Sequence, residues 1–153
     1  MVERAHISDI SFLAALRLEF LQEDCGELSD EVISKLTEAL PLYFEKNLNQ
    51  NIFCYLIREA EEAVACAFLL IVEKPANPMF ITGKTGTVLN VYTKPAYRRK
   101  GYGKALMKKL LQDAVEMNLS YVELESTDAG YNLYKSLGFT DVKSKYHYMK
   151  WHI

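Results

Sequence analysis

One stretch of the sequence constrains the fold more than any other, because a strand pattern, a glycine-containing turn and a helix pattern follow one another directly. Residues 87–93 are rich in valine and threonine, as strands are, and residues 103–117 have helical periodicity. The apolar side chains of that helix share one face, opposite a lysine-rich one: Leu106, Leu110, Leu111, Ala114 and Val115. A strand pattern at residues 121–125 completes a β-loop-α-β unit. We therefore expect a mixed α/β fold.

The rest of the chain predicts further strands and helices on either side of this unit. We expect strands at residues 2–6, 52–58, 63–72 and 146–151, and helices at residues 8–23, 29–48 and 129–137. Pro41 interrupts the second of these helices, so a kink or two short helices are expected there. The chain has 153 residues, which predicts a single domain over residues 1–153.

Composition argues against several classes of protein. The net charge is −2, whereas a nucleic-acid-binding domain is typically strongly basic. No apolar run approaches the roughly 20 residues that cross a bilayer, and the N-terminus opens without the hydrophobic stretch of a signal peptide. The three cysteines form no CxxC pair, and no Cys/His cluster predicts a metal. We expect a cytoplasmic protein with free thiols and no nucleic-acid, membrane or metal partner, in which Cys54 and Cys66 are core residues.

The turn before the helix at residues 103–117 has the features of an anion site. The first-turn N–H groups of a helix lack internal acceptors and lie at the positive end of its dipole. Gly101 and Gly103 allow close approach of the backbone, and basic side chains surround them: Arg98, Arg99, Lys100 and Lys104. Leu106 stands where the dinucleotide fingerprint needs a third glycine, and the phosphate loop of NTPases does not match either. A tight turn with a solvated basic rim would give the same pattern.

This region resembles the GNAT superfamily of N-acetyltransferases. Arg98, Gly101 and Gly103 match the family pattern of arginine or glutamine, two residues, glycine, one residue, and glycine or alanine. Residues 91–95 resemble the valine- and proline-containing strand end that precedes it, and residues 130–139 resemble the family segment that contains Leu-Tyr and ends in Gly-Phe. The resemblance implies a central, mostly antiparallel sheet that is splayed at an acetyl-CoA cleft, with helices on both faces.

The resemblance also implies roles for individual residues toward the co-substrate acetyl-CoA. Main-chain atoms of Val91, Tyr92 and Thr93 would pair with pantetheine. Main-chain N–H groups would hold the pyrophosphate, from Arg98, Arg99, Lys100, Gly101, Tyr102, Gly103 and Lys104. Tyr134 matches the tyrosine that lies near the cofactor sulfur, and a phenol can donate a proton to a departing thiolate. A core aromatic residue on the last helix would give the same pattern.

The general base is less well defined by the sequence. Glu123 and Glu125 share one face of a strand, and Asn90 and Tyr92 share a face of the preceding one. Glu125 is the candidate for the base, although many similar members of the family have histidine where Glu125 stands. Asn90 is a further candidate catalytic residue, because with Tyr92 it would line the acceptor cleft. A chain of water molecules is an alternative to a dedicated base. We expect direct transfer in a ternary complex.

The acceptor is predicted only as a class. Six acids and no base lie between Arg17 and Lys35: Glu19, Glu23, Asp24, Glu27, Asp30 and Glu31. In the related fold this segment overhangs the acceptor, so a cationic primary amine of a small molecule or peptide is expected; a solvated helix face is the alternative. A non-catalytic acyl-CoA-binding module and a nucleotide binder remain competing interpretations. A C-terminal strand with Tyr146, Tyr148 and Trp151 could form a homodimer interface or belong to the core.

Overall fold

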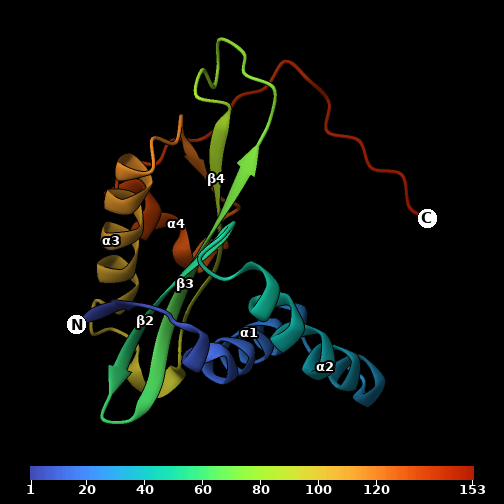
Figure 1. Ribbon diagram of the computed structural model, residues 1–153, viewed down its shortest axis with the longest axis vertical. Coiled ribbons are helices and arrows are strands. Elements are labelled where there is room, and N and C mark those ends of the chain that lie inside the picture. Colours follow the sequence, from blue (N-terminus) through green and yellow to red (C-terminus); the bar gives the residue numbers. More distant parts are fainter.

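A five-stranded sheet forms the centre of the computed structural model, which describes residues 1–153 (Figure 1). The strands lie in chain order: β1 (Val2–Arg4), β2 (Ile52–Glu59), β3 (Glu62–Glu73), β4 (Lys84–Thr93) and β5 (Val122–Glu123). All neighbours are antiparallel except β4 and β5, which are parallel. This arrangement confirms the mixed, mostly antiparallel α/β sheet. Long runs of buried apolar residues in β2 and β3 mark them as central strands covered on both faces.

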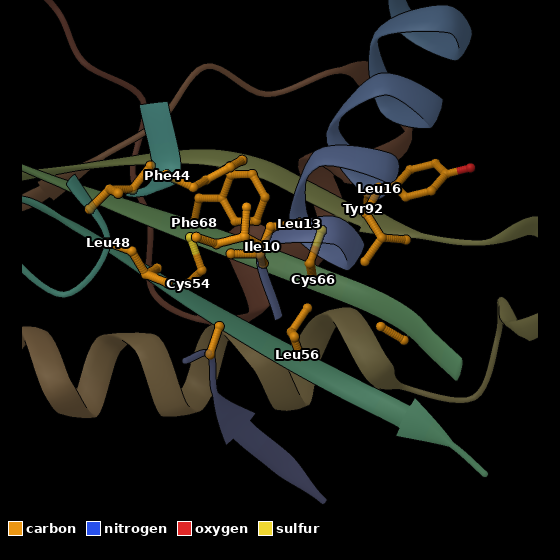
Figure 2. Close-up of a cluster of buried hydrophobic side chains, with 13 residues drawn as sticks. Ile10, Leu13, Leu16, Phe44, Leu48, Cys54, Leu56, Cys66, Phe68 and Tyr92 are labelled. Atoms are coloured by element: carbon orange, nitrogen blue, oxygen red, sulfur yellow. The ribbon is translucent and has the colours of Figure 1, made fainter. Parts of the chain in front are cut away.

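Helices cover both faces of the sheet, as expected. Figure 1 shows α1 (Ile10–Cys25) and α2 (Asp30–Asn47) on one side, and α3 (Tyr102–Glu116) and α4 (Asp128–Ser136) on the other. Alternate strand residues face the two sides, so the protein has two apolar clusters. In the cluster on the α1 side, Phe44 packs edge-on against Phe68 and Cys54 and Cys66 are buried free thiols (Figure 2). The prediction of both cysteines as core residues is therefore confirmed.

Helix α2 begins at the cap that the sequence predicts and continues through its proline. Ser29 caps α2 by accepting a hydrogen bond from the Val32 N–H. Pro41, however, lies inside one continuous helix, so the alternative of two short helices was wrong. Leu40 and Phe44 flank the proline and both pack into the α1-side cluster, and this packing holds the helix together across the missing N–H donor. No helix of the protein combines the length and the apolarity that crossing a membrane requires.

Strand β4 is irregular in its second half. Ala65 and Cys66 pair with Thr93 and Tyr92, but Phe68 already pairs with Leu89, so Asn90 and Val91 form a bulge. Asn90 adopts a left-handed backbone conformation with φ of 55°. On its other side, β4 pairs with β5 only at two positions near its start. The sheet is therefore splayed along the rest of β4.

The expected C-terminal strand at residues 146–151 is absent, which corrects the sequence-based prediction. Residues after 137 form no regular secondary structure, and the chain leaves the body of the protein (Figure 1). Alternating aromatic residues favour a strand locally, but a strand also needs a neighbouring edge for its hydrogen bonds. The adjacent edge strand β5 has only two residues, and residues 140–153 make no backbone hydrogen bonds to it. Tyr146, Tyr148 and Trp151 consequently remain 74–88% exposed.

Candidate active site

The turn between β4 and α3 leaves a row of backbone donors unused. A short 3₁₀ helix (η2, Pro95–Tyr97) ends β4, and Arg99 and Gly101 then take left-handed conformations with φ of 65° and 80°. Gly101 is the N-cap of α3, and the first backbone hydrogen bond of the helix runs from Ala105 to Gly101. The N–H groups of residues 99–104 donate to no acceptor in the protein. A row of free donors at a helix N-terminus fits a phosphate group.

A groove of about 360 Å³ lies over this turn. It is lined by Thr93, Tyr97, Arg98, Arg99, Gly101, Tyr102, Gly103, Lys104, Ala129 and Leu133. Of the residues predicted for the pyrophosphate, only Lys100 is not part of this lining; its ammonium group lies over the rings of Tyr97 and Tyr102. A Cβ atom on Gly103 would come within 3.3 Å of the Leu133 side chain, so α4 approaches the turn closely because position 103 is glycine.

The open edge of β4 leads away from this groove. Beyond the two positions paired with β5, the strand is hydrogen-bonded to β3 alone. Val91, Tyr92 and Thr93 belong to this unpaired section, which is where a ligand could add main-chain hydrogen bonds in place of a strand. The side chain of Tyr92 points elsewhere, into the α1-side cluster.

A smaller hollow of about 70 Å³ lies along the same edge of β4. Tyr134, Glu125 and Asn90 all line it, so the three residues predicted for catalysis lie at one place although they come from different elements. Its remaining lining is mostly apolar: Phe20, Val88, Leu89, Val91, Leu124 and Thr127. Consecutive residues of α4 line the two spaces, Leu133 the groove and Tyr134 the hollow.

Comparison with known proteins identifies the family. The sequence matches the acetyltransferase (GNAT) family over residues 16–139. The chain belongs to the GNAT family. Members of this family use acetyl-CoA as the acetyl donor. Among curated proteins, none matches the chain significantly in sequence.

Solved structures similar to this GNAT protein agree with the fold. A predicted acetyltransferase from Clostridium acetobutylicum, solved with acetyl-CoA, is 25% identical, with a TM-score of 0.83, over 98% of this chain and 95% of that one. A GCN5-related N-acetyltransferase from Ralstonia eutropha JMP134 is 21% identical, with a TM-score of 0.80, over 97% of both chains. A glucosamine-6-phosphate N-acetyltransferase from Arabidopsis thaliana is 19% identical, with a TM-score of 0.65, over 97% of both chains.

Tyr134 of the GNAT chain is held in place without using its hydroxyl group. Its ring packs edge-on against Phe139, and a Cβ atom on Gly130 would come within 2.8 Å of it. The phenol makes no hydrogen bond within the protein, and burial raises the pKa of Tyr134 above its ordinary value. The hydroxyl group is therefore protonated at neutral pH and free to donate. Its catalytic role stays a prediction.

Asn90 connects the hollow to Arg17, a residue that the sequence-based prediction of the site does not include. Its side chain accepts a hydrogen bond from Arg17 Nη1 at 3.1 Å and donates one to Cys66 Sγ at 3.2 Å. Arg17 lies in α1 one helical turn before Phe20. This spacing, which is visible in the sequence, places the two side chains on the same face of the helix.

Half of the acids between Arg17 and Lys35 are paired within the protein. Glu19 lies 3.3 Å from the ammonium group of Lys94 and accepts a hydrogen bond from the Tyr92 hydroxyl. Glu23 pairs with Arg98 and Glu31 with Lys35. The unpaired acids are Asp24, Glu27 and Asp30. A cationic acceptor stays a prediction. Fewer unpaired acids are available to attract it than the sequence alone indicates.

Proposed function

We propose that this protein is an acetyl-CoA-dependent N-acetyltransferase that acts on a primary amine of a small molecule or peptide. The observation that carries the proposal is the adjacency of two spaces along β4 and α4: a groove with free backbone donors, and a hollow with a protonated phenol. The first suits the pyrophosphate of coenzyme A, and the second suits the acetyl end and the attacking amine.

The residues at the groove fit the co-substrate. The free N–H groups of residues 99–104 and the positive end of α3 would hold the pyrophosphate. The unpaired edge at Val91 and Thr93 would bind pantetheine by main-chain atoms. Because the backbone makes these contacts, the glycines contribute by allowing the conformation of the turn. The basic side chains add an attraction to the pyrophosphate that is screened by salt.

The chemistry of the hollow follows from its residues. The neutral amine attacks the acetyl carbonyl carbon, a bond to nitrogen forms, and the carbon–sulfur bond breaks with the electron pair leaving on sulfur. Tyr134 donates its proton to that thiolate. Glu125, which is exposed at the rim, or a water molecule takes the proton from the amine. Direct attack by the amine requires no covalent intermediate on the protein. Neither buried thiol is ionised at neutral pH, because burial raises the pKa of Cys54 and raises that of Cys66 to about 12.

The test measures release of the free thiol of coenzyme A with a panel of amines. Tyr134→Phe is expected to lower kcat by about 100-fold, the usual contribution of a general acid, with coenzyme A affinity unchanged. Tyr131→Phe on the same helix is the matched control, because Tyr131 is exposed and its hydroxyl group donates a hydrogen bond to Asp141. An unchanged kcat in Tyr134→Phe removes the acid role. Binding of coenzyme A with no turnover of any amine by the wild type would favour a non-catalytic acyl-CoA-binding module.

A further inference from the structure

Arg17 is a half-buried arginine that has no carboxylate partner. Its Nη1 donates a hydrogen bond to Asn90 Oδ1, and its guanidinium carbon lies 5.6 Å from the centre of the Phe20 ring. No carboxylate oxygen lies within 4.0 Å of it, whereas Arg58 and Arg98 both form ion pairs. Arg4 and Arg99, the other arginines without such a pair, are exposed to water.

This environment leaves a positive charge partly dehydrated and without an ion-pair partner, and the carboxylate of Asp24 acts on it only from beyond ion-pair distance. A guanidinium carries five N–H donors, and only one of those of Arg17 is used within the protein. Burial lowers the pKa of Arg17, but arginine remains charged at any physiological pH. The nearby Cys66 thiol supplies no negative charge, because burial raises its pKa to about 12. Dehydrating a charge is unfavourable unless an anion compensates it.

The position of Arg17 relates this charge to the candidate acceptor site. Phe20 and Asn90, which Arg17 contacts, both line the hollow that contains Tyr134. An acceptor whose amine enters this hollow from the α1 side would place its remaining atoms beside the unused guanidinium donors. Arginine binds planar oxyanions through two parallel hydrogen bonds, which fixes orientation as well as adding attraction.

We propose that Arg17 binds an oxyanion of the acceptor, either a carboxylate or a phosphate, and so selects amines that also carry negative charge. This inference rests on the proposed N-acetyltransferase function and names the substrate class of the same site. The acceptor would then be zwitterionic, with its ammonium group drawn by the unpaired acids of residues 24–30 and its oxyanion held by Arg17.

The experiment compares matched acceptors in the thiol-release assay. Three pairs differ by a carboxylate: lysine and cadaverine, tyrosine and tyramine, histidine and histamine. A fourth pair, glucosamine 6-phosphate and glucosamine, differs by a phosphate and distinguishes the two sources of the oxyanion. At least one anionic member is expected to have the higher kcat/KM. Arg17→Gln should lower the ratio of kcat/KM within that pair by about 10- to 100-fold, chiefly through KM, with partial recovery in Arg17→Lys.

Arg4→Gln is the matched control, because Arg4 hydrogen-bonds Asn49 and lies away from both spaces. Equal loss for both members of every pair, or preference of the wild type for the members that lack the oxyanion, would overturn the inference. Calorimetric titration of the same compounds into the protein with bound coenzyme A separates this outcome from failure of the proposed function. If no amine is acetylated, tighter binding of an anionic member to the wild type than to Arg17→Gln still supports the oxyanion site, and equal binding refutes it.

Discussion

The guanidinium of Arg98 donates two hydrogen bonds to the carboxylate of Glu23, with Nη2 2.8 Å from Oε1 and 2.5 Å from Oε2. Its Nε donates to the carbonyl of Thr93 at 2.9 Å. This arginine of the family motif therefore connects the turn under the groove to α1, the helix that contributes Phe20 to the hollow. Its charge is largely neutralised by a protein acid, so it contributes less to phosphate attraction than its place in the motif suggests.

The first prediction concerns this ion pair. Glu23→Gln removes the acid that neutralises Arg98, so coenzyme A affinity should rise by about two- to fivefold at low salt, the size of an exposed charge interaction. The gain should disappear in high salt because the pair is half-exposed and screened. Isothermal titration at two salt concentrations measures this, with Asp24→Asn as the control for a neighbouring acid without an ion pair. Weaker binding by Glu23→Gln would instead mean that the pair holds the turn in its binding conformation.

The second prediction is that the backbone conformation of the turn affects coenzyme A affinity more than the charge of its side chains does. Gly101 has φ of 80°, a conformation that costs a non-glycine residue about 1–2 kcal/mol, and more if it is β-branched. Gly101→Val should therefore reshape the turn and raise the Kd for coenzyme A by about tenfold or more. Arg99→Ala should raise it less, since the Arg99 side chain is exposed.

Gly26→Val is the control for this comparison. Gly26 also has positive φ, of 78°, with open space where a Cβ atom would stand, and it ends α1 and lines neither the groove nor the hollow. It should lower the free energy of unfolding while the Kd for coenzyme A stays the same. If Arg99→Ala weakens binding more than Gly101→Val does, the main-chain donors are not the principal contacts.

The reliability of the sequence-based predictions depended on the range of the interactions involved. The strand, turn and helix around Gly101 and the cap at Ser29 are specified by neighbouring residues, and the structure confirms these elements. The C-terminal strand could not be predicted correctly, because its formation depends on a remote edge, β5, which is two residues long. The convergence of Asn90, Glu125 and Tyr134 on one hollow follows from the family resemblance, and periodicity alone does not predict it.

Arg17 shows why the candidate site was incomplete in sequence. Its contact with Asn90 spans 73 residues, and it depends on a bulge that turns Asn90 into a left-handed conformation. An asparagine is favoured there because it tolerates that conformation, but nothing in the local pattern of β4 indicates a bulge. The sequence-based prediction that Asn90 and Tyr92 reach the same side of the sheet is nevertheless confirmed, since their side chains contact Arg17 and Glu19 of α1.

The third prediction tests the buried network at Asn90. Asn90→Ala loses hydrogen bonds to Arg17 and Cys66 and places alanine at φ of 55°, so the free energy of unfolding should fall by about 1–3 kcal/mol. Asn90→Gly should be less destabilising than Asn90→Ala, the reverse of the usual order within strands, because glycine tolerates positive φ. Chemical denaturation measures both. Asn118, which is exposed with φ of 57°, is the control. The difference in unfolding free energy between its alanine and glycine variants gives the cost of positive φ without the loss of buried hydrogen bonds. Equal stability of the two Asn90 variants would contradict the left-handed conformation.

The fourth prediction uses Trp151, the single tryptophan of the chain, as a probe of the C-terminal segment. Its side chain is 87% exposed, so at low protein concentration its emission should match that of N-acetyltryptophanamide in water and be fully quenched by acrylamide. The sequence-based prediction of a homodimer adds a second expectation: at higher concentration the emission should shift to shorter wavelength as the mass measured by light scattering doubles. Exposed apolar residues at 142, 146, 148, 149, 151 and 153 provide the surface for such an association.

Two matched variants connect the fluorescence change to that surface. Tyr148→Lys should abolish the concentration dependence, because it places a charge among the apolar residues, whereas Ser144→Lys adds the same charge near the start of the segment and should retain it. A shifted and protected emission in a monomer at every concentration would mean that the segment packs on its own chain, against the exposure found in the structure. If the emission does not shift up to the highest concentration and the mass stays that of a monomer, the prediction of a homodimer is wrong. The prediction that the segment is exposed would still hold.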